Sequence, residues 1–291
     1  MNIDSNDLIK SFQGSLPINL KLLANLFQVR ELVIHPEEVS PLYLLNDGKS
    51  PASLHLPLDT YIGMETLLTK QYFPQTIHMM NEVIRGGNES YALIDIGANI
   101  GLYTRQSLNI FKKINKVFAY EPHPNNFSLL LKNLSNIRDI EMNMYGLGTK
   151  NATLEFYLDP NNNGNYSLNK NAMSEMHGQI NVDVKNAAEE SIKWMNSFEG
   201  EFIYKSDTQG YDETIISAIE PSFWSRVKCG VIELWRIEGK DYDVDSFIRM
   251  LDSFPCKMFE KMPGKNVSSL EVLQFLNSND GASEDLLFWR V

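Results

Sequence analysis

Cysteine is scarce in this sequence, and its scarcity excludes several kinds of site. Cys229 and Cys256 are the only two cysteines among 291 residues, and neither belongs to a CxxC pair or a Cys/His cluster. A structural zinc site needs about four such ligands, so we expect no metal site of that kind. Two cysteines also form no disulfide framework, which favours a reducing, cytoplasmic setting.

Long hydrophobic runs and an excess of basic charge are also missing. No stretch approaches the roughly 18 uncharged apolar residues of a membrane-spanning helix, and residues 1–7 lack the basic start of a signal peptide. We therefore expect a cytoplasmic protein without membrane insertion. Lys plus Arg number 26 against 37 Asp plus Glu, a net charge of −11. This balance argues against nucleic-acid partners and against binding to anionic membranes, because both attract basic surfaces.

What the chain does contain is enough apolar material for a sizeable core. It is 43% hydrophobic and 11% aromatic, which excludes a disordered or low-complexity protein. Residues 1–87 differ from the rest: the pattern predicts a helix over 16–33, a proline-rich loop region, and a helical stretch over 64–84 interrupted near Pro74. We interpret residues 1–87 as a helical N-terminal extension that covers the substrate or mediates oligomerisation, and residues 88–291 as the main domain.

From residue 88 onward, short apolar runs alternate with helical patterns. The runs at 92–96 and 117–121 predict buried strands, with helices over 101–111 and after Pro124. Further core strands are predicted at 140–144, 202–207, 230–235, 257–261 and 286–291, with extra strands at 152–158 and 179–184 and helices at 214–219, 244–254 and 268–276. Strand, helix, strand, helix is typical of an α/β fold, a parallel sheet with helices on its faces.

A glycine turn is the sharpest feature of this main domain. The strand ending at Asp95 and Ile96 runs into Gly97, and Gly101 opens the next helix. Glycine allows a ligand to approach the backbone closely, and the N–H groups of the following helix can hold a carboxylate or phosphate. The spacing is Gly-x-x-x-Gly rather than Gly-x-Gly-x-x-Gly, which weakens a dinucleotide interpretation.

An acidic residue lies at the matching place on the next strand. Glu121 ends the predicted strand at 117–121, 24 residues after Gly97. In α/β folds, an acid at about this offset binds the two ribose hydroxyls of a nucleoside cofactor. Together, the turn and the acid predict a nucleoside cofactor at this edge of the sheet.

Three segments resemble a known family. The stretches 95–101 and 120–124 resemble the S-adenosylmethionine site of class I methyltransferases. The stretch 205–212, Lys-Ser-Asp-Thr-Gln-Gly-Tyr-Asp, is similar to the Lys-x-Asp-x-Glu/Gln-Gly-x-Glu stretch of the FkbM-type family, and 164–168 is similar to a loop of that family. The resemblance covers residue 91 to the C-terminus. It departs at Ser206, where an apolar residue is usual, and at Asp212, where Glu is usual.

The resemblance implies a Rossmann-like class I methyltransferase fold, with a seven-stranded mixed sheet and helices on both faces, here preceded by the helical N-terminal extension. It implies S-adenosylmethionine as cofactor, S-adenosylhomocysteine as product, and O-methylation of a hydroxyl on a sugar, glycan or related natural product. The expected partner is therefore a small-molecule or glycan acceptor, and self-association of the chain is left open. No metal site is predicted, because the spacing of Asp207, Asp212 and Glu233 is not that of a recognised metal site, although binding by them is possible in principle.

The resemblance and the strand ends together give a set of cofactor-binding candidates. Asp95 can reach the ammonium of the cofactor, the turn 97–101 can hold its methionine moiety, and Glu121 can bind its ribose. Backbone at 145–147 can border the adenine. The full set is Asp95, Gly97, Ala98, Asn99, Gly101, Thr104, Glu121, Pro122, Tyr145, Gly146 and Asp207.

Four residues are candidates for catalysis. Asp207 ends a core strand where open α/β sheets bind ligands, so it is the leading general base, although it could also be a helix cap. Lys205 alternates to the same face and could simply pair with Asp207. His123 is a second base candidate, or a turn residue between two prolines. Glu233 lies inside an apolar strand, where a carboxylate must be paired or face a cavity.

Two other functions remain open on the sequence alone. A dinucleotide-dependent oxidoreductase shares the glycine turn and the ribose acid. A non-catalytic S-adenosylmethionine-binding module would keep the fold, although the intact set of Asp95, Gly97, Gly101 and Glu121 argues against it.

Overall fold

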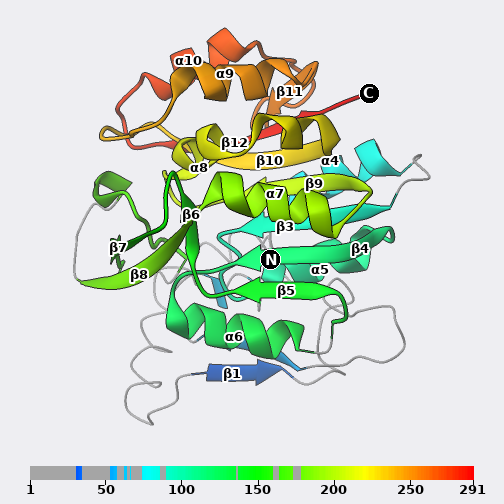
Figure 1. Ribbon diagram of the computed structural model, residues 1–291, viewed down its shortest axis with the longest axis vertical. Coiled ribbons are helices and arrows are strands. Elements are labelled where there is room, and N and C mark those ends of the chain that lie inside the picture. The colour runs from blue at the N-terminus through cyan, green and yellow to red at the C-terminus, as the bar shows by residue number, and fades with distance from the viewer. Residues whose placement is uncertain are drawn as a thin grey trace, which may run out of the picture.

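The computed structural model describes residues 31–34, 53–57, 62–63, 66, 74–85, 90–135, 137–159, 164–172 and 178–291. Its centre is a sheet of seven strands in the order β11-β12-β10-β9-β3-β4-β5 (Figure 1). The strands are β3 (Tyr91–Ile96), β4 (Ile114–Tyr120), β5 (Ile140–Asn143), β9 (Glu201–Ser206), β10 (Val227–Trp235), β11 (Cys256–Phe259) and β12 (Ser283–Trp289). Strand β12 is antiparallel to both of its neighbours, and the pairs from β10 to β5 are parallel. The predicted mixed sheet of seven strands is confirmed.

Two apolar clusters cover the two faces of this sheet, because a strand that is buried on both sides alternates its side chains between them. All six residues of β3 are buried; Leu93 joins one cluster and Ile94 the other. The helices α4 (Pro74–Ile84), α5 (Leu102–Ile110) and α6 (Pro124–Leu134) pack on the Leu93 side. The helices α7 (Ala187–Ser197), α8 (Asp212–Ala218), α9 (Val244–Asp252) and α10 (Ser269–Leu276) pack on the Ile94 side.

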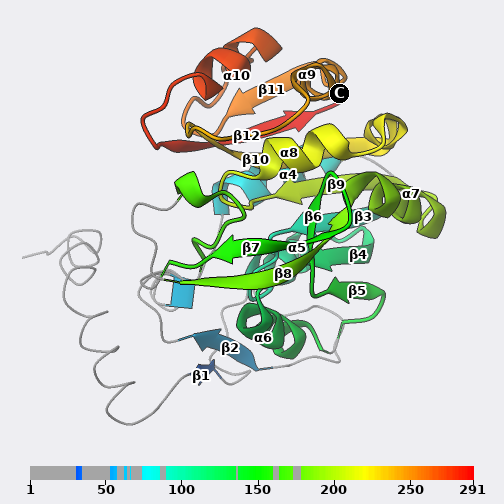
Figure 2. The same cartoon turned by 60° about the vertical axis from the view of Figure 1, so that its left-hand side comes forward.

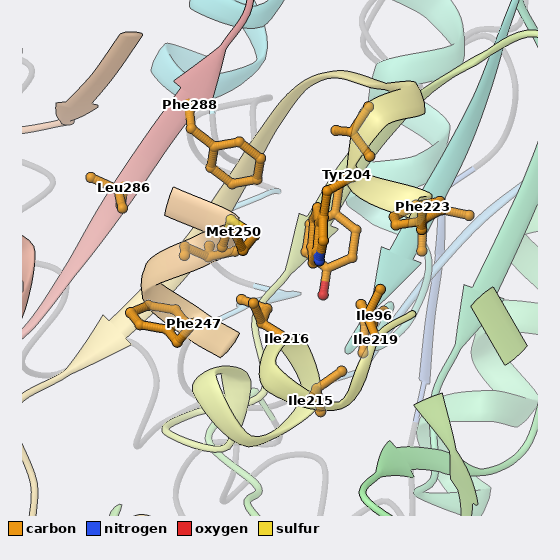
Figure 3. Packing of buried hydrophobic residues seen from close by; sticks show 14 of the residues in the cluster. Ile96, Tyr204, Ile215, Ile216, Ile219, Phe223, Phe247, Met250, Leu286 and Phe288 are labelled. Atoms are coloured by element: carbon orange, nitrogen blue, oxygen red, sulfur yellow. The ribbon is translucent and has the colours of Figure 1, made fainter. Parts of the chain in front are cut away.

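The Ile94 side of the core is rich in aromatic rings. Figure 3 shows Tyr204 of β9 and Phe223 of the 3-10 helix η2 (Pro221–Arg226) close to Ile216 of α8 and Phe288 of β12. The centroids of the Tyr204 and Phe223 rings lie 6.4 Å apart in an edge-to-face arrangement, which aromatic pairs prefer. This packing fixes α8 against β9, so the turn between them is held in place.

A second sheet lies beside the central one. It has the order β6-β8-β7, from β6 (Gly146–Gly148), β7 (Ala152–Tyr157) and β8 (Gln179–Asn186). Figure 2 shows β7 and β8 side by side, and in Figure 1 both lie to the left of the central sheet. The predicted strands at 152–158 and 179–184 therefore form, but outside the main sheet. The short strand β6 was not expected, because three residues carry no readable periodicity.

The predicted N-terminal extension is described only in part. Strands β1 (Glu31–Ile34) and β2 (Leu54–Pro57) pair antiparallel, so the prediction that the helix continues through residue 33 is wrong. Backbone N–H and C=O groups of His55 bond the side chain of Asn133 in α6, at 2.6 and 2.9 Å. Helix α4 agrees with the helical stretch expected up to residue 84. The rest of the two predicted helices, 16–30 and most of 64–73, lies outside the described residues, and the boundary at residue 88 stays a prediction.

Candidate functional site

A pocket opens at the carboxyl ends of β3, β4 and β9, where open α/β sheets bind ligands. It holds about 780 Å³, counting the part that is open to solvent. Side chains and backbone from the turns after these strands line it, together with residues of the second sheet. The lining includes Gly97, Ala98, Asn99, Glu121, Pro122, Gly146, Leu147, Phe156, Gly164, Tyr166, Leu168, Lys205, Asp207, Thr208 and Gln209.

The glycine turn takes a backbone shape that most residues avoid. Gly97 has φ 72°, Asn99 has φ 50° and Gly101 has φ 85°, all in the left-handed region. The amides of Gly97 and Ala98 donate to the carbonyl of Tyr120 at 3.0 and 2.9 Å. A Cβ on Gly97 would lie 1.9 Å from the carbonyl oxygen of Asp207. The backbone of the turn therefore lies directly against the backbone at Asp207, just after β9.

Glu121 is held by backbone donors on both sides of its carboxylate. Its Oε2 accepts from the N–H of Asn99 at 2.9 Å, and its Oε1 accepts from the N–H of His123 at 2.8 Å. The side chain is buried but lines the pocket. Burial raises the pKa of Glu121 to about 7, because desolvation disfavours the charged form. Each oxygen keeps a second lone pair that can accept a ligand hydroxyl.

Asp95 and Lys205 form a buried pair beneath the pocket. The Lys205 ammonium lies 3.1 Å from Asp95 Oδ1, and the Thr104 hydroxyl donates to Asp95 Oδ2 at 2.5 Å. Lys205 also donates to the carbonyls of Ile96 and Gly97, at 3.2 and 2.7 Å. Burial lowers the pKa of Lys205, but the charges of Asp95 and Asp207 outweigh it and raise this pKa above its usual value. The expected pairing of Lys205 with Asp207 is wrong, since Lys205 binds Asp95.

Asp207 lines the other side of the pocket, and Glu233 lies behind it, outside the lining. The side-chain amide of Gln209 donates to Asp207 Oδ1 at 2.6 Å and to Glu233 Oε2 at 2.8 Å. The indole N–H of Trp235 also donates to Glu233 Oε2, at 2.7 Å. Burial and then the nearby charge of Asp207 raise the pKa of Glu233 well above its usual value. A carboxylate inside an apolar strand was expected to need partners, and Glu233 of β10 has them in Gln209 and Trp235.

A loop from the second sheet closes over this cluster. The hydroxyl of Ser167 donates to the carbonyl of Gln209 at 2.7 Å, and the Asn169 side chain donates to the carbonyl of Gly210 at 3.4 Å. Backbone bonds of 2.9 and 3.1 Å join Ser167 to Tyr157 at the end of β7. The turn that carries Asp207 is thus tied to the second sheet. The polar run 161–163 lies outside the described residues.

Comparison with known proteins assigns the family once this geometry is known. A family model described as "Methyltransferase FkbM domain" matches residues 95–279, more than half of the chain. The chain belongs to the FkbM methyltransferase domain family. The expected resemblance is confirmed, and the matched residues include the glycine turn, Glu121, and the whole Asp207–Glu233 cluster.

The relatives of this FkbM-domain chain are distant. "Methyltransferase 1" from Beauveria bassiana (strain ARSEF 2860) is 25% identical over 171 residues, which cover 50% of this chain and 66% of that protein. The structure of methyltransferase FkbM from Methylobacillus flagellatus KT has 14% identity and a TM-score of 0.39, covering 78% of this chain and 52% of that one. SMU.1697c, a putative methyltransferase from Streptococcus mutans in complex with SAH, has 10% identity and a TM-score of 0.35. The match covers 76% of this chain and 100% of that one.

Several predicted cofactor residues of this FkbM domain lie on the pocket, and others lie behind it. Asp95, Gly101, Thr104 and Tyr145 are not part of its lining. Asp95 is fully buried, so its proposed contact with the ammonium of a cofactor stays a prediction. The Tyr145 hydroxyl donates to Glu190 at 3.2 Å, while the neighbouring backbone at Gly146 does line the pocket.

His123 takes a structural position. Its ring Nδ1 accepts from the N–H of Asn126 at 3.4 Å and so caps helix α6. The ring is buried and packs edge-on against the ring of Tyr166, with 4.7 Å between the two ring centroids. This burial lowers the pKa of His123. A neutral ring fits a cap that accepts a hydrogen bond, because protonated histidine has no acceptor. The role of His123 as a base stays a prediction.

Several lining residues were not predicted as site residues, among them Phe156, Tyr166, Leu168 and Thr208. The first three come from the second sheet and its loop. The alternation over 152–158 was a signal that one face of this strand is apolar, but nothing in the sequence said that it faces the pocket.

Two kinds of feature are absent from the described part of the chain. Within the described ranges, no helix has both the length and the apolar character required to cross a membrane. No three His, Cys, Asp or Glu side chains of the described residues are grouped as a metal ion would require.

Proposed function

We propose that this chain is an S-adenosylmethionine-dependent O-methyltransferase that acts on a hydroxyl of a sugar, a glycan or a related natural product. The observation that carries the proposal is the carboxylate of Glu121. It lies on the pocket wall, where each of its oxygens accepts from one backbone N–H and burial raises its pKa. Two adjacent ribose hydroxyls would supply further donors. Membership of the FkbM family supports methyl transfer as the reaction.

The residues around the pocket fit such a cofactor. Gly97, Ala98 and Asn99 line the pocket, so an amino-acid moiety can lie beside the turn. The backbone of Gly146 and Leu147 offers a wall for adenine, and the side chain oxygen of Asn99 is buried without a hydrogen-bond partner among the described residues. When bound, the sulfonium supplies an activated methyl group.

The protein then has to align the acceptor and remove its proton. Alignment is the larger part of such catalysis, since an in-line displacement needs the two reacting atoms held together. Asp207 lies on the pocket wall with Oδ1 occupied by Gln209. The Glu233 carboxyl also lies within hydrogen-bond reach of Asp207, and Asp207 is the member of this pair that lines the pocket, where it can accept the hydroxyl proton. We propose an uncharged small-molecule or glycan acceptor in the cytoplasm, and neither nucleic acid nor a membrane as partner.

Calorimetry with S-adenosylhomocysteine and with NAD tests the cofactor. Binding of the former alone is expected, and binding of NAD alone would replace the proposal by a dinucleotide-dependent oxidoreductase. Transfer of a labelled methyl group to a panel of glycans and nucleotide-sugars tests the reaction. Cofactor binding without turnover on any acceptor would indicate a non-catalytic binding module.

A further inference from the structure

One side-chain amide joins the carboxyl group of Asp207 on the pocket wall to the carboxyl group of Glu233 behind it. Gln209 Nε2 lies 2.6 Å from Asp207 Oδ1 and 2.8 Å from Glu233 Oε2. These residues come from different elements, since Asp207 and Gln209 follow β9 and Glu233 belongs to β10. The amide therefore fixes the distance between two acids that would otherwise repel one another.

The hydrogen bonds decide where a proton is held in this cluster. Glu233 Oε2 accepts from both Gln209 and Trp235, so in the neutral form of this carboxyl Oε2 is the carbonyl oxygen. That leaves Oε1 to carry the proton. Two carboxyls this close in a site of low dielectric do not both ionise, and Asp207 is the member that lines the pocket.

The other charged groups near Glu233 favour the same arrangement. Among the described residues, Asp285 faces it from β12 as its cross-strand partner. The charge of Asp285 raises the pKa of Glu233 further, after burial and Asp207. Glu260, beyond β11, acts on Asp285, and Lys205 is the cation that offsets part of this charge. Asp207 and Asp285 thus both raise the pKa of Glu233, and burial and then Asp207 raise the pKa of Asp285 as well.

Hydrogen bonds on both sides of Gln209 hold its backbone in an uncommon conformation. Gln209 has φ 56°, which is uncommon for a residue with a side chain. Its carbonyl accepts from Ser167, and the amide N–H of Thr208 donates to the carboxylate of Asp212 at 3.2 Å. A residue keeps such a strained backbone angle only where several surrounding contacts hold it there.

We propose that Gln209 is a positioning residue that presents Asp207 to the acceptor, with Glu233 as its neutral counterpart holding a proton on Oε1. This inference rests on the proposed function. During transfer, the acceptor O–H bond breaks as its oxygen bonds to the methyl carbon. The methyl–sulfur bond breaks and its electron pair stays on sulfur, while the hydroxyl proton goes to Asp207 Oδ2. Gln209 holds Oδ1, so Oδ2 is the oxygen that faces the acceptor.

Infrared spectroscopy of the ligand-free protein tests the proton on Glu233. At a pH above 8, the wild-type protein is expected to keep a carbonyl band of a protonated carboxyl that disappears in Glu233→Gln. The exposed Glu199 is a matched control, so Glu199→Gln should keep the band. A wild-type spectrum that equals that of Glu233→Gln would overturn the proposal.

The same band tests the role of Gln209. Gln209→Ala removes one of the two donors to Oε2, so the carbonyl band should move to higher wavenumber, an effect that a merely structural role would not produce. Trp235→Phe removes the other donor and should move the band in the same direction, which keeps the test available if Gln209→Ala does not fold. A band unmoved in a folded variant contradicts the assignment of Oε2 as the carbonyl oxygen.

Calorimetry with S-adenosylhomocysteine separates this inference from the proposed function. Gln209→Ala should change its Kd by less than about fivefold, since at most one neutral hydrogen bond is lost. A folded Gln209→Ala that no longer binds would show that Gln209 serves the cofactor instead, against the proposal. If the wild type fails to bind while the infrared band behaves as expected, the proposed function fails and the acid pair stands.

Discussion

Lys205 and Asp95 are direct partners across two neighbouring parallel strands, and their side chains form an ion pair of 3.1 Å with no more than 5% of either exposed. The pair lies directly beneath the pocket, and the lysine also binds two carbonyls of the glycine turn. Breaking a buried pair leaves one uncompensated charge, which is far more costly than losing a surface pair.

Lys205→Met should therefore destabilise the protein by about 3–5 kcal/mol, the usual cost of a buried charge left alone. Urea unfolding measures this. Lys116→Met is the matched control: Lys116 pairs with Glu141, which is 51% exposed, and its loss should cost less than about 1 kcal/mol. Equal losses of unfolding free energy in the two variants would show that the buried pair stabilises the protein no more than the exposed one.

Gly97→Ala should disrupt the glycine turn by steric conflict. The added Cβ would lie 1.9 Å from the backbone carbonyl of Asp207. Gly281 has a similar φ of 74° but no heavy atom within 4 Å of its added Cβ, so Gly281→Ala isolates the cost of the backbone angle, about 1 kcal/mol. We expect a clearly larger loss of unfolding free energy for Gly97→Ala, together with loss of S-adenosylhomocysteine binding. Similar values for both variants would contradict the close approach.

The pKa of Glu121 predicts how binding depends on pH. Burial raises this pKa from 4.5 to about 7, and ribose hydroxyls donate more strongly to the ionised form. S-adenosylhomocysteine should therefore bind more tightly as the pH rises through about 7, with release of a proton. Calorimetry in buffers of different ionisation enthalpy measures both effects. Glu121→Gln should bind weakly and without this pH dependence.

The same shift has the opposite consequence for the stability of the ligand-free protein. Because the folded pKa lies above the unfolded one, the contribution of Glu121 is fully present below about pH 4.5 and is lost as the pH rises through about 7. Glu121→Gln should thus flatten the fall in unfolding free energy over this window. A wild-type profile that does not fall relative to the variant there would contradict the raised pKa.

Ser167→Ala should loosen the tie between the second sheet and the turn of Asp207. The buried hydroxyl donates to Gln209 and accepts from the N–H of Asn169 at 2.9 Å, so its loss should cost about 1–3 kcal/mol. Ser135 is exposed, and Ser135→Ala should stay within about 0.5 kcal/mol of the wild type. Thermal unfolding of the two variants compares them, and equal melting temperatures would argue against the tie.

The parts of the fold that depend on local pattern could be predicted from the sequence. Strand β3, the glycine turn and Glu121 follow one another within about thirty residues, and a βα unit of that length fixes their relative placement. The same holds for the turn after β9, which carries Asp207. These features share one edge because parallel strands end together.

Long-range relations could not be predicted. Alternation correctly placed Lys205 and Asp207 on one face, but the partner of Lys205 depends on β9 lying next to β3. Residues 31–33 are apolar enough for a helix, yet they form a strand because residues 54–57 pair with them; tertiary context overrides such weak propensities. His123 carried no sign in the sequence that its ring would cap α6.

The contact between Gly97 and Asp207 involves only main-chain atoms, and the Asp207 N–H donates to the Ile96 carbonyl at 3.1 Å. At this contact, no flexible side chain separates the glycine turn from the turn after β9, so a shift of one turn is not absorbed by a change of side-chain conformation. A change in the peptide groups around one ligand is therefore transmitted directly to the carboxylate beside the other. Substitutions elsewhere on the pocket wall can alter which molecule enters the pocket. The backbone contact between Gly97 and Asp207 would keep the spacing between the glycine turn and the Asp207 carboxylate unchanged.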